Sequence, residues 1–237
     1  MRRGIIAIDG PAASGKSSTA RAVAEALGFS HLDSGALYRA ITHVALDEAA
    51  RAGVDNPLAL AFESVLRGAE DRGLMLQPDG AGFACYLDGA PADAELRTPL
   101  VTAHVSAVSA VPVVREWVNA KLRELARAGV GVVVDGRDIG TVVFPDAELK
   151  VFLTATPEAR ARRRLEQRGA PVDADALARE AERLAVRDRA DASRAVAPLR
   201  RASDAIEVDT TSVAFQEQVL QIVAAARGVL GDGAGAS

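Results

Sequence analysis

The sequence has little of what marks a secreted or membrane-bound protein. It holds one cysteine, Cys85, in 237 residues, so no disulfide can form within the chain and a reducing compartment is expected. The apolar run near the N-terminus ends at Asp9, too soon for a signal peptide. No segment approaches the roughly 20 apolar residues of a membrane-spanning helix. The sequence therefore predicts a cytoplasmic protein with no membrane partner.

Basic charge, aromatic residues and histidines are also scarce. The net charge of −4 excludes the basic surface of a general nucleic-acid binder. Aromatic residues make up 4% of the chain, so the interleaved basic and aromatic residues of a single-strand binder are missing too. The three histidines, His31, His43 and His104, have neither metal-ligand nor catalytic-triad spacing, and we interpret them as structural.

What is present is an alternation of short apolar runs with longer helical patterns. The runs predict strands at residues 5–8, 29–32, 132–134, 149–155 and 205–209. The helical patterns cover residues 16–27, 36–52, 112–128, 157–168 and 175–190. Buried strands that alternate with helices predict an α/β fold with a parallel five-stranded sheet wrapped by helices. We expect one domain over residues 1–232 and a disordered tail at 233–237.

Residues 73–93 interrupt this alternation with two short strand-like pieces. The first turn signal is Pro-Asp-Gly and the second is Asp-Gly, which together are typical of a β-hairpin. The hairpin is either a surface decoration or a small lobe beside a substrate site, and the residues alone favour neither.

The segment GPAASGKS at residues 10–17 matches the phosphate-loop pattern of glycine, four residues, glycine, lysine and serine or threonine. A strand delivers the chain to a tight turn, and the next helix presents free N–H groups and the positive end of its dipole. Lys16 is one of only three lysines and can reach the outer phosphates, while the Ser17 hydroxyl can coordinate magnesium. The residues predicted to bind a nucleoside triphosphate are Gly10, Pro11, Ala12, Ala13, Ser14, Gly15, Lys16, Ser17 and Ser18.

A second set of polar residues follows the predicted strand at 132–134. Asp135 ends that strand, where it can hold metal-bound water opposite the phosphate loop. Arg137 and Asp138 lie on the turn just beyond. A structural turn needs only the glycine and one aspartate, so this Asp-Gly-Arg-Asp turn favours a functional role.

The segment HLDSGALYR at residues 31–39 carries a third set. Asp33 or Ser34 is suited to cap the helix that follows, and Arg39 lies in the early turns of that helix. Taken alone, a capping role for Ser34 is at least as well supported as a role in binding a ligand.

Two arginine-rich segments complete the candidate residues. Arg187, Asp191 and Arg194 are spaced to share one helix face, although exposed Arg–Asp pairs of this kind are worth only a few tenths of a kcal/mol. The run RARRRLEQR at residues 160–168 is either a solvated helix face or a lid over the triphosphate, with the lid spanning residues 157–173.

Together, these motifs resemble those of bacterial cytidylate kinases. The motifs are GPAASGKSS, LDSGALYR, ELRTPLVTAHVSAVSAVPVVRE, DGRDIGTVVFPDA and RDRADASRAVAPL, in that order, and they extend from about Ile5 to Asp209. The resemblance implies the P-loop kinase fold of nucleoside monophosphate kinases. It also implies that the hairpin is an insertion in the monophosphate-binding region.

The resemblance implies a role for each matching position. Four residues would meet the cytosine ring or hold its neighbours: Ser34, Ser106, Arg115 and Asp138. Arg39, Arg137 and Arg194 would clamp the acceptor phosphate. Arg187 and Asp191 would lie near the ribose. Arg160 and Arg164 would bind ATP from the lid. Lys16, Arg137 and Arg194 are the expected catalytic residues, and Ser17 and Asp135, through water, the expected magnesium ligands.

Together with the motifs, the resemblance implies ATP- and Mg²⁺-dependent phosphorylation of CMP and dCMP, and it also implies a monomer. A phosphate-monoester acceptor is already anionic, so the reaction needs positive charge and positioning rather than a general base. One alternative is a kinase for another small acceptor, such as shikimate or a different nucleotide. The other is a nucleotide-dependent switch or binding protein.

Overall fold

The chain folds into two compact units. The computed structural model describes residues 4–80, 82–127 and 131–231. Unit 1 comprises Met1–His31 and Ala128–Ser237, and unit 2 comprises Leu32–Arg127. That both units form one domain over residues 1–232 stays a prediction. The expected disorder of residues 233–237 falls outside the described residues.

Unit 1 is built on a parallel sheet. Its strands are β1 (Ile5–Asp9), β6 (Val132–Gly136), β7 (Leu149–Thr154) and β8 (Ile206–Asp209). They lie in the order β6-β1-β7-β8, and each neighbouring pair is parallel. The fifth expected strand is β2 (Ser30–Asp33), which begins in unit 1, where the Ser30 N–H donates to the Gly131 carbonyl at 2.9 Å. The predicted α/β fold with a parallel sheet is confirmed.

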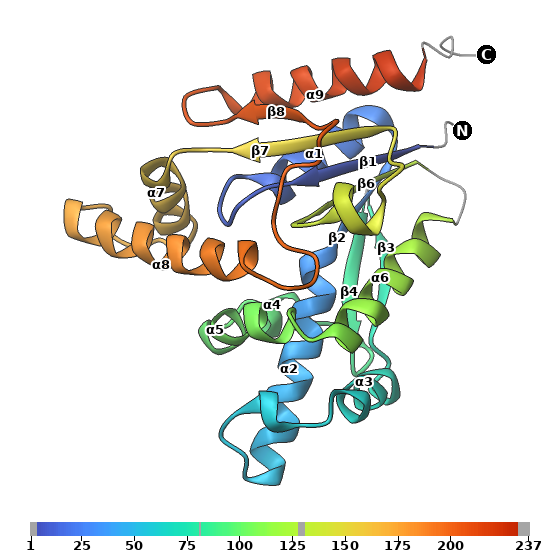
Figure 1. Cartoon of the computed structure of the whole chain (residues 1–237), viewed down its shortest axis with the longest axis vertical. Coiled ribbons are helices and arrows are strands. Elements are labelled where there is room, and N and C mark those ends of the chain that lie inside the picture. Colours follow the sequence, from blue (N-terminus) through green and yellow to red (C-terminus); the bar gives the residue numbers. More distant parts are fainter. Residues whose placement is uncertain (1–3, 81, 128–130, 232–237) are drawn as a thin grey trace. The chain divides into compact units, whose positions relative to one another are not determined.

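Four helices and one wide turn accompany this sheet. They are α1 (Lys16–Leu27), α7 (Pro157–Gln167), α8 (Ala174–Ala192), α9 (Phe215–Leu230) and the π-helical turn η2 (Ile139–Val143). Helices α1 and α9 pack together, and their apolar side chains join those of the strands in one core that includes Ile6, Val23, Val151 and Ile222. Helices α7 and α8 lie side by side (Figure 1). This core fixes the strand ends from which the candidate residues project.

Among the described residues of unit 2, five helices pack against α2, the long helix that runs through the unit in Figure 1. The helices are α2 (Ser34–Ala52), η1 (Pro57–Ala59), α3 (Phe62–Asp71), α4 (Asp93–Leu96), α5 (Pro99–Val108) and α6 (Pro112–Ala126). Proline stands in the first turn of α5 and α6, where no intrahelical N–H bond is lost. Among the described residues, no helix combines the length and the apolar character needed to cross a bilayer.

The expected hairpin is present in unit 2. Strands β3 (Met75–Asp79) and β4 (Gly82–Leu87) are antiparallel, and β5 (Ala90–Pro91) pairs with β4. At the second turn, Asp88 and Gly89 both have positive φ, 54° and 78°, which is the backbone that Asp-Gly favours in a two-residue hairpin turn. The Arg72 guanidinium binds both carboxylate oxygens of Asp88 and so anchors the turn to the end of α3. The predicted hairpin and its Asp-Gly turn are confirmed, whereas Pro78 and Asp79 of the first turn signal lie in β3, and residue 81 is outside the described residues.

Candidate active site

The phosphate loop connects β1 to α1 and depends on close backbone approaches. A Cβ atom on Gly10 would lie 2.2 Å from the Leu153 carbonyl oxygen, so only glycine fits where the loop passes β7. Gly15 caps α1 with φ at 91°, again a glycine conformation. Ala13 also lies in the left-handed region, with φ at 58°, and its side chain packs beside a small apolar cluster of Ala12, Ala161 and Leu184. The packing of Ala13 against this cluster therefore helps to fix the backbone conformation of the loop.

Lys16 is buried at the start of α1, and its ammonium group donates to the Pro11 carbonyl at 2.7 Å. Burial lowers the pKa of Lys16 well below its usual value, and Arg137 lowers it further, whereas Asp135 and Asp9 raise it. A cation held in so little water is strongly stabilised by an anion that enters beside it. The position suits binding of a phosphate group.

Asp135 lies opposite the phosphate loop and joins two elements of unit 1. Its carboxylate accepts a hydrogen bond from the Ser17 hydroxyl at 2.7 Å, and its other oxygen lies 2.7 Å from Nε2 of His31. Burial raises the pKa of Asp135, but the His31 and Ser17 contacts and the Lys16 charge outweigh burial and keep the pKa below its usual value. Asp135 therefore presents a buried, anionic carboxylate next to the Ser17 hydroxyl, and both groups have oxygen atoms that could bind a metal ion.

The arginine-rich α7 contacts the phosphate loop directly. Arg160 is buried, donates to the Ala12 carbonyl at 3.0 Å and pairs with Asp188 of α8. The second Asp188 oxygen accepts from the Ala12 N–H at 2.9 Å. Both the N–H group and the carbonyl group of Ala12 are therefore hydrogen-bonded to side chains of α7 and α8. Arg164, the other predicted lid residue, donates to Gln167 within α7 at 2.8 Å.

The Asp191 carboxylate binds two arginines, Arg137 of the turn after β6 and Arg194 of its own segment. Its side chain is 1% exposed and accepts from Arg137 Nε at 2.9 Å, while the other oxygen pairs with Arg194. Burial raises the pKa of Asp191, yet the charges of Arg137, Arg194 and Arg187 outweigh burial and lower it. Helix α8 ends at Ala192, so Arg194 lies beyond the helix and does not share the helix face of Arg187 and Asp191 that their spacing had predicted. Four predicted residues, Arg137, Arg187, Asp191 and Arg194, therefore form one cluster with a net positive charge.

Asp138 is buried at the turn between β6 and η2. Its carbonyl accepts from the N–H groups of Val142 and Val143, at 2.9 and 3.2 Å. The carboxylate of Asp9 accepts from the N–H groups of the next two residues, Ile139 and Gly140. Unit 1 therefore brings together the phosphate loop, Asp135, Arg137 and Asp138 of the turn, and the Asp191 cluster.

Unit 2 carries the remaining predicted residues on α2, α5 and α6. Asp33 is the cap of α2 and accepts from the Gly35 N–H, so Ser34 is the first helical residue, with a buried side chain, and not the cap. Arg39 donates to Thr102 of α5 and to the Leu96 carbonyl, both at 3.1 Å.

The buried Arg115 of α6 lies over the ring of Tyr38, 5.5 Å from its centroid, and donates to the Ser109 carbonyl at 3.0 Å. Ser106 lies one turn before Ser109 on α5, and its carbonyl accepts from the Ser109 hydroxyl. These contacts connect α2, α5 and α6, so unit 2 draws its four predicted residues, Ser34, Arg39, Ser106 and Arg115, from three packed helices.

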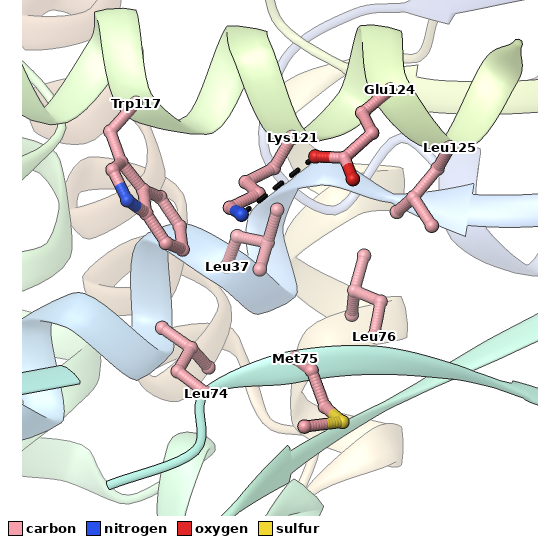
Figure 2. Close-up of a pocket in the computed structure, with 8 residues that line it drawn as sticks. All are labelled: Leu37, Leu74, Met75, Leu76, Trp117, Lys121, Glu124 and Leu125. Carbon is pink, nitrogen blue, oxygen red and sulfur yellow. Dashed lines mark ion pairs between the residues drawn. The ribbon is translucent and has the colours of Figure 1, made fainter. Parts of the chain in front are cut away.

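A separate pocket in unit 2 has a volume of about 180 Å³ and is shown in Figure 2. Its lining is mainly apolar and comes from α2, the start of the hairpin and α6, with Trp117 and Met75 among the residues labelled. The Lys121 ammonium at its edge is paired with Glu124 at 3.7 Å (Figure 2). We assign this pocket no part in phosphate binding.

Three contacts in unit 1 could not be predicted from the sequence. His31 was interpreted as structural, but it contacts Asp135. Asp188 and Asp9 were not among the predicted site residues, although each binds the backbone of a segment that was. The partners are 104 to 176 residues apart in the chain, so only the fold brings them together.

A parallel sheet with a phosphate loop after its first strand, a buried lysine and a cluster of arginines defines the P-loop kinase class. The family model for cytidylate kinase matches residues 6–228. The cytidylate kinase of Geobacillus kaustophilus is 47% identical over 94% of this chain and 96% of its own length, and that of Streptomyces griseus is 46% identical over 94% and 93%. The chain belongs to the cytidylate kinase family.

The resemblance to solved structures is weaker and concerns the fold alone. A crystal structure of an uncharacterized protein from Eubacterium ventriosum aligns with 94% of this chain at a TM-score of 0.50 and 13% identity.

Proposed function

We propose that this protein transfers the γ-phosphoryl group of ATP to CMP and dCMP, giving ADP with CDP or dCDP. The observation that carries the proposal is the buried cationic centre of unit 1, in which Lys16 of the phosphate loop has Arg137 and Arg187 as charged neighbours. Membership of the cytidylate kinase family supports CMP as the acceptor.

The cationic centre suits direct in-line transfer. An oxygen of the CMP phosphate attacks the γ-phosphorus, the bond from that phosphorus to the β–γ bridging oxygen breaks, and ADP leaves. No proton has to be removed from the attacking oxygen, because the phosphate monoester is already ionised. What must be overcome is the repulsion between two anions, and we assign Arg39, Arg137 and Arg194 to the acceptor phosphate for that reason. Lys16 would neutralise charge on the donor phosphates.

Mg²⁺ fits the oxygen atoms of Ser17 and Asp135. Both are hard donors, and the lowered pKa of Asp135 keeps its carboxylate anionic near neutral pH. Mg²⁺ commonly uses one or two protein oxygens together with water and substrate phosphates. We assign Ser17 as a direct ligand and Asp135 as a ligand through water. The ion would reduce the negative charge on the triphosphate.

Recognition of the base follows from hydrogen-bonding capacity. Asp138 would accept from the cytosine amino group, and Arg115 and Ser106 would donate to O2 and N3, with Ser34 supporting the ring. Uracil would present a carbonyl oxygen to the Asp138 carboxylate and leave two buried acceptors facing one another. Mismatches of this kind cost several powers of ten in a site built around a hydrogen bond.

The remaining predicted residues complete the proposal. Arg187 and Asp191 would lie near the ribose, and Arg160 and Arg164 would bind ATP from the lid at residues 157–173. Closure of a lid excludes water, which would otherwise hydrolyse ATP. The reaction requires no partner beyond its small-molecule substrates, and we assign the protein as a cytoplasmic monomer.

Replacing His31 with phenylalanine tests the magnesium assignment. The variant removes the hydrogen bond that orients Asp135, and we expect the Mg²⁺ concentration for half-maximal activity to rise about tenfold. The control is His43→Phe, because His43 pairs with Asp47 in unit 2 and contacts none of the predicted ligands. Equal Mg²⁺ dependence in the two variants would contradict the assignment.

The acceptor assignment is tested by ADP release from ATP and Mg²⁺ with CMP, dCMP, UMP, AMP and shikimate supplied in parallel. We expect strong turnover with CMP and dCMP that is lost in Asp138→Ala and restored by no other acceptor. Turnover with a different compound would move the assignment to another small-molecule kinase. Binding of ATP with no acceptor-stimulated turnover would favour a nucleotide switch.

A further inference from the structure

Asp9 lies where the strand before the phosphate loop meets the turn that carries Arg137 and Asp138. It is the last residue of β1, directly before Gly10, and is 5% exposed. In the sheet it lies beside Gly136 of β6, the residue before Arg137. A side chain at this position can therefore reach from the donor loop to the acceptor turn.

The Asp9 carboxylate binds that turn with both oxygens. Oδ1 accepts from the Ile139 N–H and Oδ2 from the Gly140 N–H, each at 2.8 Å. These two N–H groups begin η2, and the first N–H groups of a helical turn have no acceptor within the turn. The Asp138 carbonyl accepts from groups further along, at Thr141, Val142 and Val143. The Asp9 carboxylate therefore provides the two hydrogen-bond acceptors that the first N–H groups of η2 lack within the turn.

Burial of the Asp9 carboxylate beside another acidic side chain costs free energy, so Asp9 is an unfavourable choice if its only purpose is to accept from two N–H groups. Burial raises its pKa to about 6, the two backbone N–H groups oppose that rise, Asp138 adds to it and Lys16 opposes it. A buried carboxylate beside a second carboxylate is an arrangement that stability alone disfavours. Its position next to predicted substrate residues points to a role in placing them.

We infer that Asp9 is a positioning residue for the acceptor, which sets Arg137 and Asp138 relative to the phosphate loop through the backbone of Ile139 and Gly140. The inference rests on the proposed function, because those two side chains are assigned to the acceptor. Asp9 itself touches neither substrate. Its loss should weaken acceptor binding and leave ATP binding in place, because neither the bond from Lys16 to the Pro11 carbonyl nor the Ala12 contacts with Arg160 and Asp188 involve Asp9.

The test variant is Asp9→Asn, which keeps the shape of the side chain and one acceptor oxygen but turns an amide NH₂ group toward the second N–H. We expect kcat/KM for CMP to fall about tenfold to a hundredfold, the loss that accompanies an unsatisfied buried donor. The dissociation constant for ATP should stay within about twofold. Asp209→Asn is the matched control, since Asp209 also ends a strand of the same sheet and accepts a backbone N–H, from Thr211.

The pH profile separates positioning from simple damage. Protonation of Asp9 removes one of its two acceptor oxygens, so kcat/KM for CMP should fall as the pH drops through about 6. The phosphate group of CMP protonates in the same range. The native protein should therefore lose activity with a slope of about 2 below that pH, and Asp9→Asn with a slope of about 1.

Amide hydrogen exchange gives a readout that does not need activity. Exchange at Ile139 and Gly140 should accelerate in Asp9→Asn and not in Asp209→Asn. Faster exchange at both amides together with a loss confined to CMP supports the inference. Unchanged exchange, or equal losses for CMP and ATP, overturns it. Failure of the native protein to phosphorylate CMP overturns the proposed function instead, and the exchange result then stands by itself.

Discussion

Replacing Lys16 with methionine is expected to lower kcat about a hundredfold to a thousandfold while CMP binding stays unchanged. Methionine fills much of the volume of the lysine stem but cannot donate a hydrogen bond or carry charge. In the protein, the Lys16 ammonium is buried and bonds to the Pro11 carbonyl, so it is already in place for an anion on the phosphate loop. Loss of one such fixed donor at a site of developing charge typically costs this much.

Lys121→Met provides the control for Lys16, because it makes the same substitution at a half-exposed site. Lys121 lies on α6 in unit 2 and pairs with Glu124 at 3.7 Å. Its replacement should leave kcat within about twofold, as expected for a surface ion pair. Steady-state rates and CMP titrations of the two variants decide the matter. A kcat for Lys16→Met close to that of Lys121→Met would contradict a role for Lys16 in transfer.

The second large effect is expected for Asp191→Ala, which removes the carboxylate shared by Arg137 and Arg194. Both guanidinium groups are largely buried, and Arg187 adds a third positive charge nearby. Removing one partner of a buried ion pair typically destabilises a protein by about 3–5 kcal/mol, because the remaining charges stay buried without compensation. We expect a loss of that size in urea unfolding, together with loss of turnover, since the arginines would no longer be held for the acceptor phosphate.

Glu182→Ala is the control for Asp191, because it removes an acidic partner of an arginine from the same helix. Glu182 pairs with Arg189 at 2.8 Å on the exposed side of α8. The change in the free energy of unfolding should stay within about 0.5 kcal/mol. An Asp191→Ala protein as stable as Glu182→Ala would mean that the arginine cluster tolerates the loss of its counter-ion, contrary to this account.

Most of unit 1 could be predicted from the sequence, because its strands carry a strong local signal. Short β-branched runs are typical of buried strands, and the observed β1, β6, β7 and β8 differ from the predicted strands by at most two residues at either end, although Glu207 and Asp209 of β8 are exposed. Helix α1 has the predicted bounds, since the phosphate loop fixes its start and Gly28 ends it with φ at 66°.

Of the helices that were not predicted, the three longest are α3, α5 and α9, and the reasons differ. In α9 the sequence carries a helical signal, because apolar residues recur at helical spacing at Val219, Ile222, Val223 and Ala226, and all four are buried in the structure. In α5 the residues are largely β-branched or polar, which weakens helix propensity, and the helix relies on its Thr98 cap and on packing against α2. Helix α3 was also not predicted, although its buried residues Phe62, Val65, Leu66 and Ala69 have the same spacing.

The candidate site likewise contains residues that local sequence patterns could identify and residues that only the fold could identify. The phosphate loop is a local pattern, so its chemistry could be inferred from spacing. The spacing of Arg187, Asp191 and Arg194 indicated only a shared helix face, and their expected roles came from the resemblance to cytidylate kinases. Asp9, His31 and Asp188 act on partners more than a hundred residues away, and a lone aspartate or histidine gives no sign of such a partner. Their roles became visible only in the folded chain.

The most direct test of the central claim is to follow the products of ATP, CMP and Mg²⁺ together by phosphorus NMR. Direct transfer predicts that CDP and ADP appear in equal amounts and that inorganic phosphate stays at its background level. ADP and inorganic phosphate in equal amounts, with no CDP, would show that CMP only stimulates hydrolysis, and would contradict the assignment of the arginines to an acceptor phosphate.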